Sequence, residues 1–347
     1  MRAVRFTHWQ SAPELVEIAT PAPGPGEVLL EVDAAGLCHS DLHIMEWPEG
    51  TLPYALPFTL GHETAGTVAA LGPKTTGVSV GECVLVYSRW GCGSCWHCRQ
   101  GMENVCERSA AELGGHGGGV GRDGGLADYM VVPSVRYLVP LGDLDPVSAA
   151  PLSDAALTPY HAIKRCLPQL RPNGSAVVIG VGGIGHMAVQ ILRALSPLRI
   201  VAVDLRADAL RLARDAGADS ALLASGLTAA ELRAEVGAAG ATLVLDCVAA
   251  DATLELAAAA VAAGGTLCYM GRGGGTLPVA PGRLPFETTV MIPTWGTPAE
   301  LLEVVALARA GAIHTEAERF RLHEAVGAYE RLRRGEVVGR AVVTPRS

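Results

Sequence analysis

The stretch Ala176-Val-Val-Ile-Gly180-Val-Gly182-Gly183-Ile-Gly185 decides the fold of this 347-residue chain. It begins as a continuous apolar run, which predicts a buried strand, and a helical pattern follows from about residue 184 to residue 195. In this context Gly180 permits a tight turn, Gly182 lets a pyrophosphate approach the backbone, and Gly185 lets helix and strand pack closely. The sequence therefore predicts a dinucleotide site at these glycines, Gly183 included. A plain glycine-rich turn is the alternative.

The next expected strand, residues 200–204, ends on Asp204, and this residue bears on the choice of cofactor. A carboxylate at this position accepts hydrogen bonds from the adenosine ribose and repels a 2′-phosphate, so NAD is expected rather than NADP. Arg206 lies two residues further on and would soften that preference. An ordinary aspartate at a strand end is the alternative.

The two parts of the chain differ in their hydrophobic pattern and in the secondary structure that this pattern predicts. From about residue 152, apolar strands alternate with helical patterns, which predicts βαβ units and a doubly wound parallel sheet, the Rossmann arrangement. The first 150 residues contain short apolar runs broken by Gly and Pro, which predicts a β-rich, barrel-like domain. The expected strands are 26–33, 66–72, 176–180, 200–204, 243–247, 266–270 and 340–344, and the expected helices are 184–195, 209–214, 257–263 and 298–310.

Four cysteines stand close together at Cys92, Cys95, Cys98 and Cys106. Two-residue gaps let neighbouring thiolates converge on one tetrahedral ion, and four sulfurs leave no open position, as in a structural zinc site. Disulfides or buried thiols are the alternative. The total of nine cysteines is odd, and the N-terminus lacks the apolar core of a signal peptide, so we expect a reducing cytoplasm.

Composition excludes several classes of protein. Hydrophobic residues make up 49% and charged residues 18%, which is typical of a globular chain. The net charge of −8 argues against nucleic acid as a partner, because a binder needs a basic surface. The best candidate for a membrane span, residues 176–192, contains four glycines and His186 and is too short and polar. Neither nucleic acid nor a membrane is expected as a partner.

Three further segments contain residue types that bind metals. They are Gly36-Leu-Cys38-His-Ser40-Asp41-Leu-His43, Gly61-His62-Glu63 and Pro151-Leu-Ser-Asp154. Taken singly, Cys38 could be a buried thiol, His62 a core histidine and Asp154 a helix N-cap.

The order of these segments, the four-cysteine lobe and the glycine string resembles the zinc-dependent medium-chain alcohol dehydrogenases. The resemblance covers essentially the whole chain and includes its ending, Gly335-Glu-Val-Val-Gly-Arg-Ala-Val-Val. It implies a GroES-like catalytic domain at residues 1–152 and 290–347, with a structural zinc lobe at about 90–108. A Rossmann domain at residues 153–289 would interrupt it. The implied cofactors are NAD and two zinc ions per chain.

The resemblance also implies a catalytic zinc at Cys38, His62 and Asp154, with the fourth position open. Many family members have a second cysteine where this chain has Asp154. Bacterial secondary alcohol dehydrogenases are similar to this chain in that feature, and an aspartate remains a plausible zinc ligand. Glu63, next to His62, is the competing ligand.

Further roles follow from the resemblance. Ser40 would accept the proton of the alcohol and pass it through the cofactor ribose to His43, which would release it to solvent. Asp41 would orient His62 and fix its tautomer. Without the resemblance, Ser40 could bond the local backbone, His43 could be a surface histidine and Asp41 could form an exposed ion pair.

The expected function is NAD- and zinc-dependent oxidation of alcohols, secondary alcohols above all, to ketones or aldehydes. Tyr54 and Trp295 are candidate apolar walls of the substrate pocket, and either could be plain core. A polyol or threonine-type dehydrogenase is the nearest alternative, and a non-catalytic NAD-binding redox sensor is an alternative of another class. A homo-oligomer is expected, a tetramer rather than a dimer.

Overall fold

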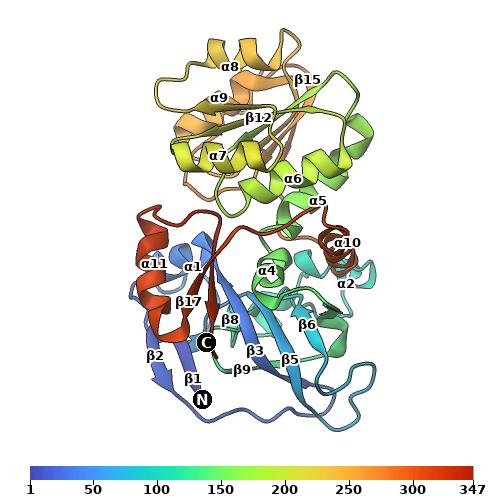
Figure 1. Ribbon diagram of the computed structural model, residues 1–347, viewed down its shortest axis with the longest axis vertical. Helices are drawn as coiled ribbons and strands as arrows, with labels where there is room; N and C mark the ends of the chain where they lie inside the picture. The colour runs from blue at the N-terminus through green and yellow to red at the C-terminus, as the bar shows by residue number, and fades with distance from the viewer. Residues whose placement is uncertain (347) are drawn as a thin grey trace. The chain divides into compact units, whose positions relative to one another are not determined.

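The computed structural model describes residues 1–346, and their contacts form two compact units. The first unit contains Met1–Asp154, Thr297–Arg309 and the chain from Thr315 onward. The second contains Ala155–Gly296 and Ala310–His314. Both chain termini lie in the first unit, where Figure 1 marks them. The described residues include no helix of sufficient length and hydropathy to cross a membrane.

The second unit contains a six-stranded parallel sheet in the order β13-β12-β11-β14-β15-β16. Its strands are β11 (Ser175–Ile179), β12 (Arg199–Asp204), β13 (Ser220–Leu223), β14 (Ala241–Asp246), β15 (Val261–Tyr269) and β16 (Thr289–Met291). The helices are α5 (Leu157–Cys166), α6 (Gly185–Leu195), α7 (Ala207–Asp215), α8 (Ala229–Val236) and α9 (Asp251–Ala260). This is the order of a Rossmann sheet, with its switch point between β11 and β14, so the predicted fold class is confirmed.

Helices cover both faces of this sheet, which explains why its strands read as continuous apolar runs. Side chains of α8 and α9 pack on the face that contains Val177 and Val201. Side chains of α7 pack on the opposite face, at Ala202. The helices α6, α7, α8 and α9 can be followed around the strands in Figure 1.

One expected helix was wrong at its end. The alanine-rich run 257–263 is helical only as far as Ala260, and Val261 begins β15. Val261 is β-branched, and Gly264 with φ of +70° follows shortly after, so the run cannot continue as a regular helix.

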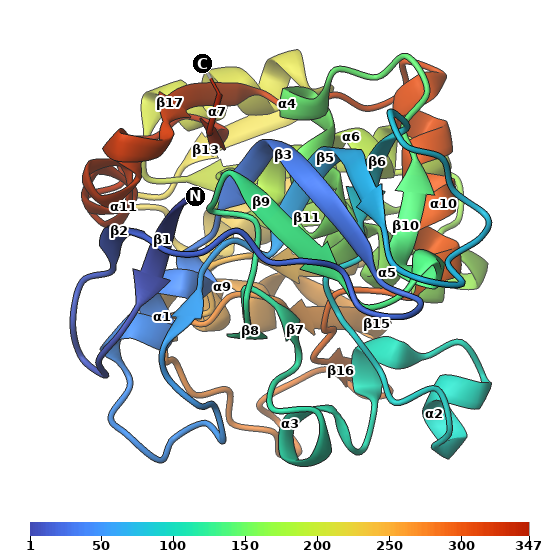
Figure 2. The ribbon, with the colours of Figure 1, turned by 90° about the horizontal axis from the view of Figure 1, so that it is seen from below.

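The first unit is built around β3 (Val28–Leu37). This strand pairs with β5, β9 and β18, all antiparallel, within a seven-stranded sheet. Figure 2 shows β9, β3, β5 and β6 side by side. The other strands are β1 (Arg2–Phe6), β2 (Glu14–Glu17), β4 (Phe58–Thr59), β5 (Glu63–Leu71), β6 (Cys83–Val86), β7 (Gly117–Gly118), β8 (Gly121–Arg122), β9 (Tyr129–Val132), β10 (Leu138–Pro140), β17 (Ala317–Arg321) and β18 (Arg340–Thr344).

Short helices in the first unit place the polar segments found in the sequence. The helix α1 (His39–Glu46) begins directly after β3, and a 3-10 turn at Ala150–Ser153 ends at Asp154. The others are α2 (Trp96–Arg99), α3 (Ser109–Glu112), α4 (Pro146–Ala149), α10 (Pro298–Arg309) and α11 (Ala325–Arg333).

The chain returns to the first unit at Thr297, later than the expected position 290. The reason lies in β16, which pairs with β15 and so extends the parallel sheet of the second unit past residue 290.

Candidate functional site

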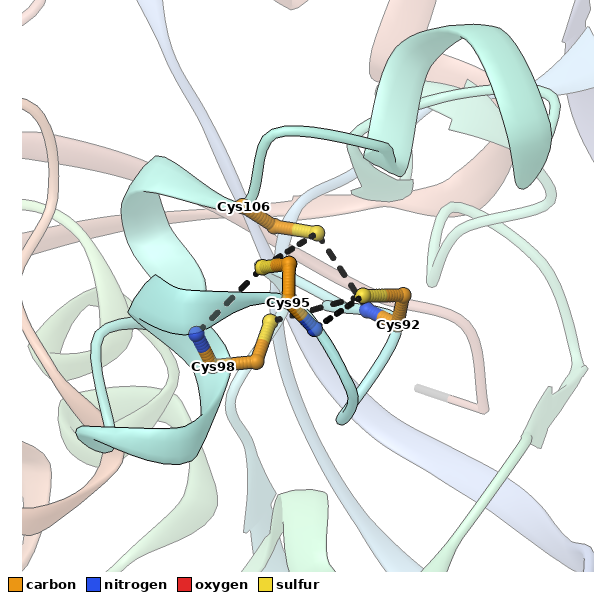
Figure 3. A group of neighbouring side chains, drawn as sticks. All are labelled: Cys92, Cys95, Cys98 and Cys106. Carbon is orange, nitrogen blue, oxygen red and sulfur yellow. Dashed lines mark hydrogen bonds between the residues drawn. The ribbon is translucent and has the colours of Figure 1, made fainter.

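The four cysteines form one compact group in the first unit. Their sulfurs all lie within 4.8 Å of one another, and the Cys92–Cys98 and Cys95–Cys106 sulfurs are 4.0 Å apart. Figure 3 shows the four side chains pointing toward one another. A disulfide needs a separation of about 2.05 Å, whereas sulfurs around a tetrahedral zinc lie about 3.8 Å apart. All four cysteines are unpaired, and their spacing fits a zinc ion.

Backbone N–H groups donate hydrogen bonds to the cysteine sulfurs of this lobe and so stabilise their thiolate form. The N–H of Cys95 donates to the sulfur of Cys92 at 3.2 Å, and the N–H of Cys92 donates to the sulfur of Cys106 at 3.3 Å. Hydrogen bonds from Ser94 lower the pKa of Cys92 to about 6, because they favour the thiolate. Burial raises the pKa of Cys98, so that thiol needs the charge of a metal to ionise.

Tyr137 connects the four-cysteine lobe to the rest of the first unit by hydrogen bonds. Its hydroxyl donates to the carbonyl oxygen of Gly91 at 2.9 Å and accepts from the N–H of Gly91 at 3.1 Å. Gly91 directly precedes Cys92, so this contact positions the start of the cysteine group.

A second group of donors comes from three distant segments of the first unit. Cys38 caps α1, His62 directly precedes β5 and Asp154 follows the 3-10 turn. The Oδ2 atom of Asp154 lies 3.5 Å from Cys38 Sγ and 3.6 Å from His62 Nε2. Tetrahedral zinc would separate these pairs by about 3.6 and 3.4 Å. The three ligand atoms lie within 4.8 Å of one another and are buried, so this donor set also fits zinc.

Asp41 holds two members of this group. Its Oδ1 atom lies 3.0 Å from His62 Nδ1, and its Oδ2 atom accepts from the backbone N–H of Cys38 at 3.1 Å. The side chain is fully buried, which excludes an exposed ion pair. A carboxylate at Nδ1 fixes the histidine tautomer and makes Nε2 the nitrogen that can ligate a metal.

Ser40 and His43 lie on α1 beside this group. The hydroxyl oxygen of Ser40 is 3.4 Å from His62 Nε2, which places it at the ligand atoms. His43 is half-buried and stands three residues later on the helix, on the same side of α1.

Glu63 faces an arginine from the C-terminal segment. The Nε atom of Arg340 donates to Glu63 Oε2 at 2.9 Å, and its Nη2 atom donates to Asp154 Oδ2 at 3.2 Å. Burial is the strongest influence on Glu63 and raises its pKa to about 7, although the charge of Arg340 opposes this. Both oxygens of Glu63 bond to Arg340, so the carboxylate is held away from the Cys38 group.

The glycine string lies at the switch point of the second unit. Gly180 has φ of +83°, and a Cβ on Gly185 would lie 1.9 Å from the carbonyl oxygen of Gly180. A Cβ on Gly182 would meet nothing within 4 Å, so the backbone there is open to a ligand. Gly183 is half-buried between them and precedes α6 by two residues. The helix begins at the third glycine of the motif, as a pyrophosphate site requires.

The side chain of Asp204 forms hydrogen bonds with the backbone, one of them within the glycine string. Its Oδ2 atom accepts from the N–H of Val181 at 2.7 Å, and its Oδ1 atom accepts from the N–H of Arg206 at 2.9 Å. The side chain of Arg206 lies 3.6 Å from Asp208, its partner on α7. The carboxylate therefore stands at the end of β12, next to the glycine string.

The two candidate pocket residues differ in their surroundings. Tyr54 is buried in the first unit, with its hydroxyl oxygen 2.5 Å from His116 Nδ1 and its ring edge-on to Phe58. Trp295 belongs to the second unit, is half-buried and has φ of +46°. The packing of Tyr54 agrees with the core alternative for that residue.

Comparisons with known proteins cover both units. Residues 24–143 match the family model described as alcohol dehydrogenase GroES-like domain, and residues 183–310 match the one described as zinc-binding dehydrogenase. A curated NAD-dependent alcohol dehydrogenase of Sulfurisphaera tokodaii is 34% identical, over 99% of this chain and 100% of the relative. The chain belongs to the zinc-dependent medium-chain alcohol dehydrogenases.

Solved structures agree with membership of this family. The alcohol dehydrogenase of Aeropyrum pernix has a TM-score of 0.91 at 30% identity, over 99% of this chain and 100% of that one. Acetophenone reductase of Geotrichum candidum, solved in complex with NAD, has a TM-score of 0.86 at 32% identity, over 99% and 97% of the two chains.

Three polar residues beside the two candidate sites were not singled out in the sequence analysis. Arg340 and Tyr329 come from the C-terminal segment, and the hydroxyl of Tyr329 donates to Asp41 Oδ2 at 2.8 Å. Asp246 ends β14, pairs in register with Ile179 just before the glycine string, and accepts from the N–H groups of Val248 and Ala249. Arg340 lay within the ending that resembles the family, but nothing in the sequence indicated its partners. Asp246 stands where an apolar strand ends, next to the switch point, and that position was the available signal.

Proposed function

We propose that this chain oxidises secondary alcohols to ketones, reversibly, with NAD as hydride acceptor and zinc at Cys38, His62 and Asp154. The convergence of these three buried donors beside the hydroxyl of Ser40 carries the proposal. Three protein ligands with an open fourth position are the arrangement of a catalytic zinc site, whereas the four-cysteine lobe fits a structural zinc.

When bound, zinc polarises the alcohol oxygen and NAD accepts the hydride. The chain's own residues prepare that chemistry. The Oδ1 atom of Asp41, 3.0 Å from His62 Nδ1, favours the tautomer with the proton on Nδ1 and so directs Nε2 to the metal. Ser40, whose hydroxyl oxygen lies 3.4 Å from Nε2, would accept the alcohol proton and pass it through the cofactor ribose to His43, which would release it to solvent. Arg340 compensates the charge of Glu63 and Asp154 in a buried setting.

The second unit supplies the cofactor site. Gly180, Gly182, Gly183 and Gly185 form the cradle for the pyrophosphate, and Asp204 selects NAD by repelling a 2′-phosphate. Arg206 weakens this preference little, since its side chain lies near Asp208.

A secondary alcohol is the favoured substrate class. Acetophenone reductase is similar over nearly the whole chain, and its name describes reduction of a ketone. Trp295 is the candidate for an apolar wall of the pocket, with Tyr54 as a second candidate.

The proposal also includes the cellular compartment and the oligomeric state of the enzyme. The nine cysteines are all unpaired, which supports a reducing cytoplasm as its compartment. A homotetramer is favoured over a dimer, in keeping with the prevalence of closed symmetric assemblies.

The test is NAD reduction on 2-octanol and on 1-octanol, followed by NADH absorbance, with zinc content measured on the same sample. We expect two zincs per chain and a clear preference for 2-octanol. A preference for 1-octanol would move the substrate class to primary alcohols, and a preference for a polyol would favour the polyol alternative. No turnover of any alcohol by fully zinc-loaded protein would favour the redox sensor.

A further inference from the structure

Asp41 contacts two of the three proposed zinc ligands through different oxygens. Its Oδ1 atom faces His62 Nδ1, and its Oδ2 atom accepts from the backbone of Cys38. The orientation of this single side chain therefore affects both ligands at once. A group that fixes the rotamer of Asp41 therefore also fixes the distance between the ligand atoms of His62 and Cys38.

A tyrosine from the far end of the chain reaches this carboxylate. The hydroxyl of Tyr329 donates to Asp41 Oδ2 at 2.8 Å across 288 residues of sequence. Both side chains are buried, with exposed fractions of 1% and 0%. Tyr329 lies on α11, which packs against α1, the helix that contains Asp41.

We propose that Tyr329 is a positioning residue for the catalytic zinc, and that it holds Asp41 so that His62 and Cys38 keep their spacing. The inference rests on the proposed zinc site and extends it to the C-terminal helix.

The surroundings of the Tyr329 hydroxyl favour this role over simple packing. Burial, together with the charge of Asp41, raises the pKa of Tyr329 well above its usual value, so the hydroxyl remains a donor. Hydrogen bonds to a charged acceptor are the stronger kind, and a buried one is screened little by solvent. Without the hydroxyl, Asp41 Oδ2 keeps only the Cys38 N–H, and the carboxylate can rotate away from His62.

The experiment compares Tyr329→Phe with Tyr137→Phe in the full-length, zinc-loaded protein. Each variant removes one buried hydroxyl, but Tyr137 bonds to Gly91 next to the four-cysteine lobe. Zinc release to a chromophoric chelator is followed at a temperature below the melting transition of every variant. A second readout is the visible spectrum of protein with cobalt exchanged into the catalytic site.

In Tyr329→Phe we expect the zinc at Cys38, His62 and Asp154 to leave about tenfold faster than in wild type. Tenfold is the low end of the effect of residues that orient metal ligands. The zinc of the four-cysteine lobe should leave at the wild-type rate. The cobalt bands should shift, because the ligand geometry changes. In Tyr137→Phe the rate for the catalytic zinc should be unchanged. Adding Tyr329→Phe to Asp41→Asn should change the release rate little, because the path through Asp41 is already altered.

Three results would overturn the inference: unchanged zinc release in Tyr329→Phe, equal acceleration for both zincs, or effects of Tyr329→Phe and Asp41→Asn that multiply. Failure of the proposed zinc site is distinguishable from these, since wild-type protein would then bind only one zinc. Failure of the proposed activity is distinguishable as well, since zinc-loaded wild-type protein would then turn over no alcohol while its zinc release could still be measured.

Discussion

Asp154, a proposed zinc ligand, contacts three other side chains of the first unit through one oxygen. Its Oδ2 atom faces Cys38 Sγ, His62 Nε2 and Arg340 Nη2. In Asp154→Ala we expect one zinc per chain to be lost and the four-cysteine zinc to stay. Turnover should fall about a thousandfold or more, because a metal Lewis acid contributes several kcal/mol. Zinc analysis and steady-state rates measure both effects.

Folding should survive this change, because Arg340 keeps its pairing with Glu63. The control is Asp143→Ala, which removes an exposed carboxylate from the same unit. Two zincs in purified Asp154→Ala would rule out Asp154 as a ligand.

Asp204 accepts two backbone hydrogen bonds, one of them from the glycine loop, and is also the residue proposed to select NAD. In Asp204→Ala the ratio of kcat/KM for NADP to that for NAD should rise tenfold or more, about 1.4 kcal/mol, because the charge that repels a 2′-phosphate is gone. Activity with NAD should fall as well, since Val181 and Arg206 lose their acceptor.

Asp204→Asn separates the two tasks. It removes the charge but keeps an acceptor for the loop, so the ratio should rise with a smaller loss of NAD activity. An unaltered ratio in both variants would remove Asp204 from cofactor choice.

At the scale of elements, the sequence predicted those helices and strands that a local hydrophobic pattern determines. The run before Gly180 is β11, the helix after it is α6, and the last strand was placed correctly at residues 340–344. Side-chain pairing across 277 or 288 residues, as in Glu63–Arg340 and Asp41–Tyr329, leaves no local pattern and could not be predicted. The proposed ligand triad was predicted only through the family resemblance, because its three segments have no fixed spacing in the sequence.

The junction of β11 and α6 gives a prediction with an internal control. In Gly185→Ala the new Cβ would lie 1.9 Å from the carbonyl oxygen of Gly180, so strand and helix must move apart. Overpacking of this kind costs about 1–3 kcal/mol, and we expect a lower melting temperature with loss of NAD binding.

Gly182→Ala meets no atom within 4 Å and should fold normally. Its Cβ would lie where the pyrophosphate approaches, so NAD affinity should still fall. Calorimetry and NAD titration of both variants test this contrast, and a stable Gly185→Ala with full NAD affinity would contradict it.

At the scale of the whole molecule, the sequence predicted two kinds of domain. It did not indicate that the chain changes units three times after residue 290, at Thr297, Ala310 and Thr315. Nor did it indicate β16, whose three residues are too few to show a period. The C-terminal segment provides β18 to the central sheet, places Arg340 against Glu63 and Asp154, and places Tyr329 against Asp41. The first unit therefore combines segments that precede and follow the second unit in the sequence.

Each unit also contains a carboxylate whose ionisation stabilises the fold. Burial alone would raise the pKa of Asp128 in the first unit, but hydrogen bonds from Arg2 lower it below its usual value. Asp219 in the second unit behaves alike, with Ile200 and Arg193 as donors. A folded-state pKa below the unfolded one means that the stabilisation is present above about pH 4 and is lost as pH falls through the folded value.

We therefore expect the free energy of unfolding to fall with pH below about 4, with contributions from both units. Asp128→Asn and Asp219→Asn should each lower stability at pH 7 by about 1 kcal/mol or less, because the ion pairs are partly exposed. Each variant should also lose less than wild type between pH 5 and pH 3, since it lacks one carboxylate to protonate. Urea unfolding at the two pH values measures the difference, and identical pH slopes for variant and wild type would show that these pairs contribute nothing to acid stability.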